Sequence, residues 1–452
     1  MTAERLFDSI CEQIPDSLGR QKVPGAALGI TCDGEQFARG FGVTNVDHPL
    51  PVDENTLFQI GSITKTFTAT AVMRLVEAGK LTLDEPIRTY LPDFSMRDPA
   101  VTEGLTMRHL LTHTGGFEGD FFLDTGNGDD ALAKFVTLMA DLPQLTPLGT
   151  VWSYNNAALA LAGRVIEVLT GKTCEAALQE LVLLPLGLKH SYLFPSEVMV
   201  HRFAVGHASR KNRTIVLRPW QLIRASAAVG GISASIKDLL RYARFHLSDG
   251  TNAEGERILS GESVRLMQRP ICPATSGFDN ALVWRVRDVD GVRCVCHGGG
   301  TYGQVSIFML MPRRRFGFCL ATNSMNGRML LPEVTKEVLS KFLGIDEPEP
   351  AHIELHRAGA LEYCGRYSAA LSDLEISFQD DKLKMQLHPK GGFPTQTTPA
   401  EPTPPPCEIG LIGADRIAMV DPPMKQTQGE FLRRPDGSIE WLRWGFRIHA
   451  RQ

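Results

Sequence analysis

Hydrophobic and polar positions divide the chain into two parts with different periods. Apolar residues form strand-like runs over 26–31 and 37–41, joined by the turn pair Asp33-Gly34. After Gly61 the spacing changes to about 3.6 residues, which predicts a helix that stops at Gly79. Further helical patterns cover 157–170, 174–184, 236–247 and 332–343, and strand patterns cover 292–296, 305–310 and 316–322. Strands therefore begin and end this part, which predicts a mixed α/β unit whose first and last strands pair, with helices packed aside.

The C-terminal hundred residues show a different pattern. Segment 346–352 is a proline-containing linker without an apolar period, so we expect domains at 1–345 and 353–452. Short alternating runs such as 374–378 and 383–387 are typical of an antiparallel sheet, and we expect a small all-β barrel. Pro399–Pro406 contains five prolines in eight residues and is expected to be an exposed loop.

Composition and charge exclude several classes of protein. The chain has 452 residues, of which 43% are hydrophobic, and 47 basic groups nearly balance 51 acidic ones. We therefore expect a well-buried core and no nucleic-acid partner. The basic run 313–315 lies between two apolar strands and is expected to be a solvated hairpin turn. No apolar stretch is long enough to cross a membrane, and no apolar segment of a secretory signal begins the chain.

The nine cysteines are scattered along the chain and form no C-x-x-C pair. This distribution favours reduced thiols that pack as small hydrophobic side chains over a disulfide framework or a zinc site. We therefore expect a cytoplasmic protein. Neither a metal nor an organic cofactor is expected, and the sequence does not define an oligomeric state.

The sharpest chemical signal is Ser62-Ile-Thr-Lys65, the only S-x-x-K in the chain. Three residues of separation place both side chains on one face of the predicted helix. In the first helical turn the backbone N–H of Ser62 lacks an intrahelical partner and is available to stabilise an oxyanion. A desolvated lysine with a lowered pKa can take the serine proton. The alternative is a helix cap followed by a solvated lysine.

Two further short segments carry candidate chemistry. Tyr154-Asn-Asn156 is the only Y-x-N; its tyrosine could act as a second base or proton shuttle if cations lower its pKa, and Asn156 could bind a substrate amide. The alternative is a capping asparagine beside a half-buried tyrosine. In His297-Gly-Gly-Gly-Thr301 the glycines would let another backbone lie close to the strand. A second H-x-G begins at His113, and we interpret it as structural.

Two other interpretations have less support. His109 and His113 are four residues apart and could share a helix face, but a zinc site needs a third ligand and no H-E-x-x-H is present. No G-x-S-x-G occurs, so an α/β-hydrolase reading lacks its main motif.

Together, S-x-x-K, Y-x-N and H-x-G in this order resemble the serine β-lactamase and penicillin-binding protein superfamily. The likeness covers about residues 5–345 and is strongest to the class C-like branch, with its D-aminopeptidases, D-alanyl-D-alanine carboxypeptidases and family VIII esterases. The resemblance implies a β-lactamase/transpeptidase-like domain, in which an antiparallel sheet is flanked by helices. The C-terminal barrel resembles the lipocalin-like barrels appended to some D-aminopeptidases and peptide-cyclising relatives.

The resemblance also implies roles for individual residues. Ser62 would be the acylated nucleophile, Lys65 its proton acceptor and Tyr154 the partner base. Asn156 would contact the substrate amide. His297 would replace the lysine of the third motif, which removes a fixed positive charge and disfavours an efficient β-lactamase. Gly299 and Gly300 would line the substrate site, where the N–H groups of Ser62 and Gly300 form an oxyanion hole.

The expected function is therefore a serine hydrolase that acts through an acyl-enzyme on small amides or esters, as a D-stereospecific peptidase or an esterase. Three alternatives remain: a peptide cyclase of the penicillin-binding-protein-type thioesterase kind, a weak β-lactamase, and a non-catalytic muropeptide-binding protein. The partner is expected to be a small-molecule or peptide substrate. Arg447, in the barrel, is a candidate for a charged group that reaches the site; an outward-facing strand residue is the alternative.

Overall fold

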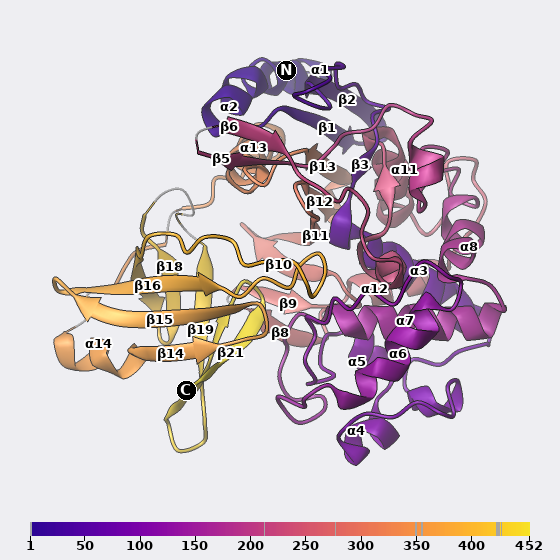
Figure 1. Cartoon of the computed structure of the whole chain (residues 1–452). Coiled ribbons are helices and arrows are strands. Elements are labelled where there is room, and N and C mark those ends of the chain that lie inside the picture. Colours follow the sequence, from indigo (N-terminus) through magenta and orange to yellow (C-terminus); the bar gives the residue numbers. More distant parts are fainter. Residues whose placement is uncertain are drawn as a thin grey trace.

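The protein consists of an α/β unit and a β-barrel that lies against it (Figure 1). A computed structural model describes residues 2–211, 213–275, 277–348, 350–353, 356–421, 425 and 427–452. The α/β unit is built on an eight-stranded antiparallel sheet in the order β2-β1-β13-β12-β11-β10-β9-β8. Its strands are β1 (Gly25–Cys32), β2 (Glu35–Gly42), β8 (Cys272–Thr275), β9 (Phe278–Asn280), β10 (Arg285–Val289), β11 (Val292–Gly300), β12 (Val305–Met311) and β13 (Phe316–Thr322).

The first and last strands of this sheet pair, as the sequence pattern predicts. Strand β1 lies antiparallel to β13, with Leu28 opposite Leu320 and Ile30 opposite Phe318. Both strands are buried along most of their length, because helices cover both faces of the sheet. The expected hairpin turn at 313–315 joins β12 to β13, where Arg315 adopts a left-handed conformation.

Helices from the two ends of the α/β unit cover one face of the sheet. They are α1 (Ala3–Cys11), α2 (Ile14–Gln21) and α13 (Gly327–Leu343), and they share a core with strand residues such as Met309 and Phe318. The other face packs against α11 (Ile236–Leu247) and the remaining helices. Helix α13 begins five residues earlier than predicted, because burial of Leu330 and Leu331 favours an extra turn despite Pro332 inside the helix.

The helical block between the strands positions the candidate residues. Its central helices, α3 (Thr64–Glu77) and α7 (Asn156–Thr170), pack together and against α10 (Ala227–Gly230). Asn155 caps α7 by accepting the N–H of Ala158, and Gly171 ends the helix with a positive φ. The other helices of this block are α4 (Pro99–Gly104), α5 (Met107–Leu111), α6 (Ala131–Leu138), α8 (Cys174–Leu178), α9 (Pro195–Val198) and α12 (Gly261–Gln268). The pattern over 174–184 forms α8 followed by a π-helical turn at Gln179–Leu183.

Two small sheets complete the α/β unit. The first has the order β3-β7-β4 and consists of β3 (Phe58–Gln59), β7 (Ser233–Ala234) and β4 (Ser191–Tyr192). The second is the hairpin of β5 (His207–Arg210) and β6 (Arg213–Val216). Strand β3 ends two residues before Gly61, so the first of these sheets holds the start of the segment that carries Ser62.

The C-terminal part is a closed barrel, as expected. Its strands pair in sequence order, and β14 closes the barrel by pairing with β21. Alternate side chains point inward and form a separate core that includes Tyr367, Leu374 and Leu442. The strands are β14 (Gly365–Ser368), β15 (Ser372–Gln379), β16 (Lys382–Pro389), β17 (Cys407–Gly413), β18 (Arg416–Met419), β19 (Gln428–Arg433), β20 (Ile439–Trp444) and β21 (Arg447–Arg451), preceded by helix α14 (Arg357–Tyr363).

We propose that the boundary between the two parts lies within 346–352. Ile345 is buried in the core of the α/β unit, whereas the N–H of Ile353 donates to Leu411 in barrel strand β17. The core of the α/β unit thus holds the residue before the linker, and a backbone hydrogen bond ties the residue after it to the barrel. In the described part of the chain, no helix combines the length and apolar character needed to cross a bilayer.

Candidate functional site

Ser62 lies at the start of α3, where a 3₁₀ turn at Gly61–Ile63 runs directly into the helix. Gly61 has φ +52°, and a side chain there would come 2.6 Å from the backbone nitrogen of Gly300. Only glycine combines this left-handed conformation with such a close approach. Gly61 and Gly300 therefore allow the segment that carries Ser62 to lie directly against strand β11.

Lys65 lies one turn after Ser62 and is completely buried. Its Nζ is 3.0 Å from Oγ of Ser62 and donates to the carbonyl oxygen of Val229, also at 3.0 Å. Burial, assisted by the positive charge of Arg447, lowers the pKa of Lys65 well below its ordinary value. The alternative of a solvated lysine is therefore excluded. With its lowered pKa, the buried amine can accept a proton.

Tyr154 lies in the loop before α7, with its ring next to the Lys65 amine. Nζ of Lys65 is 4.9 Å from the ring centroid, and the His297 ring is 6.1 Å away. The Tyr154 hydroxyl is buried, and no described residue forms a hydrogen bond of good geometry with it. Burial raises the pKa of Tyr154 to about 12, although Ser62, Arg447 and Arg285 act in the opposite direction. Nearby cations therefore do not produce the lowered pKa that a second base would need, and the phenol is protonated at neutral pH.

His297 lies on β11 and is only 3% exposed. Its Nδ1 lies 2.6 Å from the carbonyl oxygen of Gly298, so Nδ1 carries a proton and Nε2 is an acceptor when the ring is neutral. Burial and the charges of Arg285 and Lys65 lower the pKa of His297 well below its ordinary value. The imidazole is thus neutral, and it supplies no fixed positive charge at the position that the family lysine would occupy.

The second and third of the three glycines after His297 have different structural roles. A methyl group on Gly299 would meet the carbonyl oxygen of Ile60 at 1.9 Å, so this residue allows the backbones to pack closely. A methyl group on Gly300 would meet nothing within 4 Å, so that side of Gly300 faces open space. Strand β11 continues through both glycines and ends at Gly300, four residues beyond the predicted strand. The expected close approach of another backbone is confirmed.

Asn156 is part of a three-residue network that reaches into the barrel. Its Nδ2 donates to Oδ1 of Asp120 at 2.8 Å. Asp120 also accepts two hydrogen bonds from Arg447, at 2.8 and 3.0 Å. The side chain of Asp120 is 4% exposed, so this ion pair is shielded from water on the acid's side. Asp120 therefore engages one of the two amide hydrogens of Asn156, and the second hydrogen and the carbonyl oxygen are the groups left for a ligand.

The barrel contributes directly to this site. The Arg447 guanidinium lies 4.8 Å from the centroid of the Tyr154 ring. The N–H of Tyr154 donates to the carbonyl oxygen of Phe446 at 2.8 Å, and the N–H of Ile448 donates to Oγ of Ser153. The candidate role of Arg447 at the site, left open by the sequence, therefore has a structural basis, and an outward-facing position is excluded.

His113 and Asp120 belong to the site but were not singled out as functional from the sequence. His113 is buried, and its Nδ1 accepts the N–H of Asn155 at 3.1 Å while its ring centroid lies 4.6 Å from that of Tyr154. His109 instead contacts Thr106 in a capping box, so the two histidines do not share a helix face. The H-x-G motif at His113 was the one sequence feature that could have indicated a role for this histidine. No motif indicates a role for Asp120, because its partner Arg447 is 327 residues away along the chain.

Substitution of Asp120 by asparagine is expected to weaken the attachment of the barrel. Asparagine has nearly the same shape as aspartate but no charge, so the positive charge of Arg447 loses its negatively charged partner. We expect a loss of about 2–4 kcal/mol in the free energy of unfolding, measured by chemical denaturation. The matched control is Asp249→Asn, which removes the acid of an exposed Asp249–Arg257 pair and should leave the free energy of unfolding almost unchanged. Equal effects of the two substitutions would contradict this assignment.

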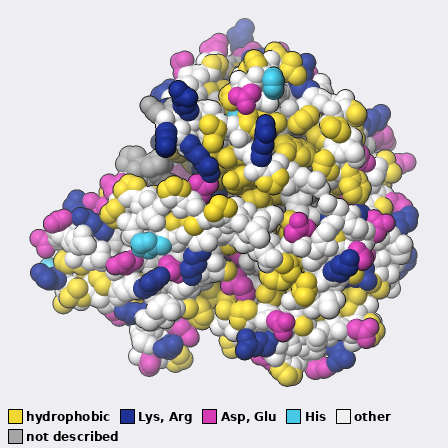
Figure 2. Space-filling model, viewed as in Figure 1, with side chains coloured by type: hydrophobic (Ala, Val, Ile, Leu, Met, Phe, Trp, Pro, Cys, Tyr) yellow, Lys and Arg dark blue, Asp and Glu magenta, His cyan; other side chains and the backbone are white. Residues whose placement is uncertain are grey.

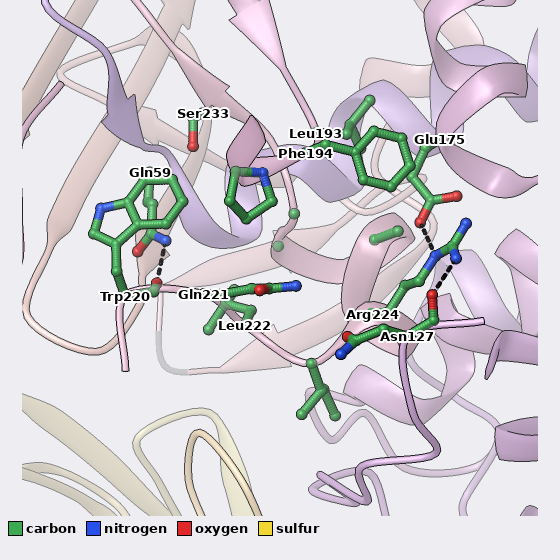
Figure 3. A pocket seen from close by; sticks show the side chains of 15 residues that line it. Gln59, Asn127, Glu175, Leu193, Phe194, Trp220, Gln221, Leu222, Arg224 and Ser233 are labelled. Carbon is green, nitrogen blue, oxygen red and sulfur yellow. Dashed lines mark hydrogen bonds and ion pairs between the residues drawn. The ribbon is translucent and has the colours of Figure 1, made fainter. Parts of the chain in front are cut away.

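A pocket opens beside the segment that carries Ser62 (Figure 3). Gln59 of β3 and Gly230 of α10 contribute to its inner wall, and Phe194 and Trp220 belong to its lining. We refer to it below as the side pocket. Its lining does not include Ser62, Lys65, Tyr154, His297 or Arg447, so the pocket adjoins the candidate residues without containing them.

Fold and site together define a mixed α/β protein with a partly exposed serine next to a buried lysine, beside a tyrosine and a histidine. The family profile described as Beta-lactamase matches residues 7–339. The chain therefore belongs to the beta-lactamase family of serine hydrolases, esterases and peptidases, whose neighbours include penicillin-binding proteins.

Individual relatives agree with this assignment. The chain is 36% identical over 334 residues to penicillin-binding protein 4 of Amycolatopsis lactamdurans, covering 72% of this chain and 88% of that protein. It is 32% identical over 229 residues to the esterase EstB of Burkholderia gladioli, covering 47% of this chain and 56% of the esterase. The crystal structure of SurE matches with a TM-score of 0.75 at 24% identity and covers 99% of both chains, so the likeness in fold extends through the barrel.

Proposed function

We propose that the protein transfers acyl groups through a covalent intermediate on Ser62, with small amides or esters as donors. The observation that carries the proposal is the 3.0 Å separation of Oγ of Ser62 from a completely buried lysine amine. A neutral amine at this distance can take the serine proton as Oγ attacks the substrate carbonyl. The attack forms a tetrahedral oxyanion, and collapse of that intermediate releases the alcohol or amine.

The remaining residues have complementary roles in this proposal. The N–H groups of Ser62 and Gly300 stabilise the oxyanion. Tyr154 enters the reaction as a neutral phenol, passes its proton to the leaving group and regains a proton from the protonated Lys65 beside it, which agrees with the pKa of about 12. Asn156 receives the substrate amide at its carbonyl oxygen. His297 accepts a hydrogen bond at Nε2.

Within this chemistry we favour a D-stereospecific peptidase or an esterase over a β-lactamase. The neutral His297 offers no fixed charge for the carboxylate of a β-lactam. Acidic and basic side chains are interspersed on the face shown in Figure 2, which suits a small uncharged donor better than a polyanion.

Transfer to an amine, as in a peptide cyclase, is the second candidate. The observation that favours it is the contact of the barrel with the loop of Tyr154, where the Tyr154 N–H donates to the carbonyl oxygen of Phe446. A barrel that covers this side of the site would limit the access of water, so that an amine takes the acyl group instead.

The test is a panel of activated short-chain esters, L- and D-configured peptide amides and a chromogenic β-lactam, each measured with and without added amino acids. Turnover of esters or amides, together with a fluorophosphonate adduct on Ser62, is the expected result. Formation of amide products in the presence of amino acids would select transfer to an amine, the second candidate. Absence of both turnover and adduct would contradict the proposal and favour a non-catalytic binding protein.

A further inference from the structure

His113 holds the backbone on both sides of Tyr154. Its carbonyl oxygen accepts the N–H of Ser153 and its Nδ1 accepts the N–H of Asn155, both at 3.1 Å. The N–H of Tyr154 itself donates to the carbonyl oxygen of Phe446 at 2.8 Å. Three consecutive N–H groups are therefore fixed, and a single histidine fixes two of them.

The backbone of His113 has an unusual conformation. Its φ of +56° lies in the left-handed region, which residues with a Cβ seldom adopt. Such a conformation persists only where surrounding contacts hold it, and residues of this kind cluster at active sites. The two hydrogen bonds to the loop of Tyr154 are contacts of this kind, so they tie the conformation of His113 to the site.

The imidazole of His113 also packs against the phenol of Tyr154. The two ring centroids are 4.6 Å apart, and the indole of Trp152 lies perpendicular to the imidazole at 6.1 Å. The same phenol ring contacts the Lys65 amine and the Arg447 guanidinium, which lie 4.9 and 4.8 Å from its centroid. Because His113 is only 1% exposed, it gives the phenol a fixed surface to rest on beside Lys65.

The imidazole of His113 is neutral. Nδ1 accepts an N–H and carries no proton, so the single proton of the ring is on Nε2. Nε2 is buried, and no described residue forms a hydrogen bond with it. Burial, assisted by the positive charges of Lys65 and Arg447, lowers the pKa of His113 to about 3. The ring therefore does not compete with Lys65 for the serine proton, and its contacts are with the loop and ring of Tyr154.

We propose that His113 is a positioning residue for the transfer of a proton from Tyr154 to the leaving group. This inference rests on the proposed function. As the bond between the acyl carbon and the leaving group breaks, the phenol O–H bond breaks and its proton bonds to the leaving atom; Lys65 then returns a proton to the phenolate. A small displacement of the phenol slows this step. A leaving group that departs without a proton does not need it.

The experiment compares p-nitrophenyl butyrate with ethyl butyrate, which have the same acyl group. p-Nitrophenolate is a weak base and departs without a proton, whereas the strongly basic ethoxide needs one. His113→Ala should lower kcat/KM for ethyl butyrate by about 10–100-fold and that for p-nitrophenyl butyrate by less than about threefold. His113→Asn should recover most of the loss, because asparagine tolerates the left-handed conformation and its Oδ1 can accept the N–H of Asn155.

Two further variants identify the residue through which His113 acts. Tyr154→Phe removes the proton donor, so adding His113→Ala to it should change the ratio of the two kcat/KM values by less than about twofold. His109→Ala lies four residues earlier in the same segment, where His109 contacts Thr106, and it should leave the wild-type ratio unchanged. Labelling of Ser62 by a fluorophosphonate should persist in His113→Ala, which checks that the site is still folded.

The outcomes separate this inference from the proposed function. If His113→Ala lowers kcat/KM equally for both esters, the histidine has only a structural role and the inference is wrong. A further selective loss with ethyl butyrate in the Tyr154→Phe background would also overturn it. If His113→Ala does not fold, His113→Gln takes its place, because its longer side chain puts the amide beyond the Nδ1 position; the same selective loss is expected. If the wild-type protein turns over neither ester and Ser62 is not labelled, the proposed function itself fails.

Discussion

Ser62→Ala is expected to abolish ester and amide turnover, with a fall in kcat of about 10³-fold or more. Alanine retains the helix start but removes the only atom that can form the covalent bond to the acyl group. The variant should also give no mass increase with a fluorophosphonate, measured on the intact protein. Its backbone N–H groups are unchanged, so substrate binding should persist.

The matched control for this prediction is Ser9→Ala. Ser9 lies in α1, where its hydroxyl donates to Leu6 and accepts from Lys341. This substitution should leave turnover and labelling intact. Turnover that survives in Ser62→Ala, or an adduct at another residue, would show that the nucleophile lies elsewhere.

Lys65→Met is expected to have the second-largest effect and to separate activity from stability. Methionine fills similar space but cannot accept the serine proton, so kcat/KM should fall about 10²–10⁴-fold. Burial of the amine disfavours its charged form, and the apolar methionine carries no such cost. The free energy of unfolding should therefore rise by about 1–2 kcal/mol, measured by chemical denaturation.

The pH dependence of the two proteins should differ in a defined direction. The unfolded lysine binds a proton at higher pH than the folded one, because the folded pKa is lowered. The wild-type protein thus gains stability with rising pH up to the ordinary lysine pKa, and its acylation rate falls on acidification as Lys65 becomes protonated. Lys65→Met should show neither this rise in stability with pH nor this fall in acylation rate on acidification.

Lys237→Met serves as the control for this pair of measurements. Lys237 is an exposed partner of Glu54 and should lose neither activity nor pH dependence when substituted. A Lys65→Met variant that is inactive and also less stable would indicate a structural role for the lysine in place of the proposed base.

The parts of the site that depend on local spacing could be predicted from the sequence. Ser62 and Lys65 are three residues apart, so a helix alone brings them together. The pairing of β1 with β13 followed from the order of strands and helices. Tyr154 and His297 required the resemblance to a family, because nothing in their local patterns indicates that they lie near Ser62.

Other features depend on contacts that no local pattern records. Asp120 lies in a loop and gains its importance only from Arg447, which lies in the other part of the chain. The protonation state of Tyr154 could not be predicted either, since its pKa reflects a balance between burial and surrounding cations. The side pocket escaped sequence analysis for a similar reason: Phe194, Trp220 and Gly230 are brought together only by the folded chain.

The contacts between the barrel and the loop of Tyr154 have a consequence for biosynthesis. A polypeptide emerging from the ribosome presents Ser62 and Lys65 long before Phe446 and Arg447, which accept the Tyr154 N–H and balance Asp120. Strand β14 must then pair with β21 to close the barrel. Maturation of this centre therefore waits for synthesis of the barrel, and until then the nascent chain carries Ser62 and Lys65 without these partners.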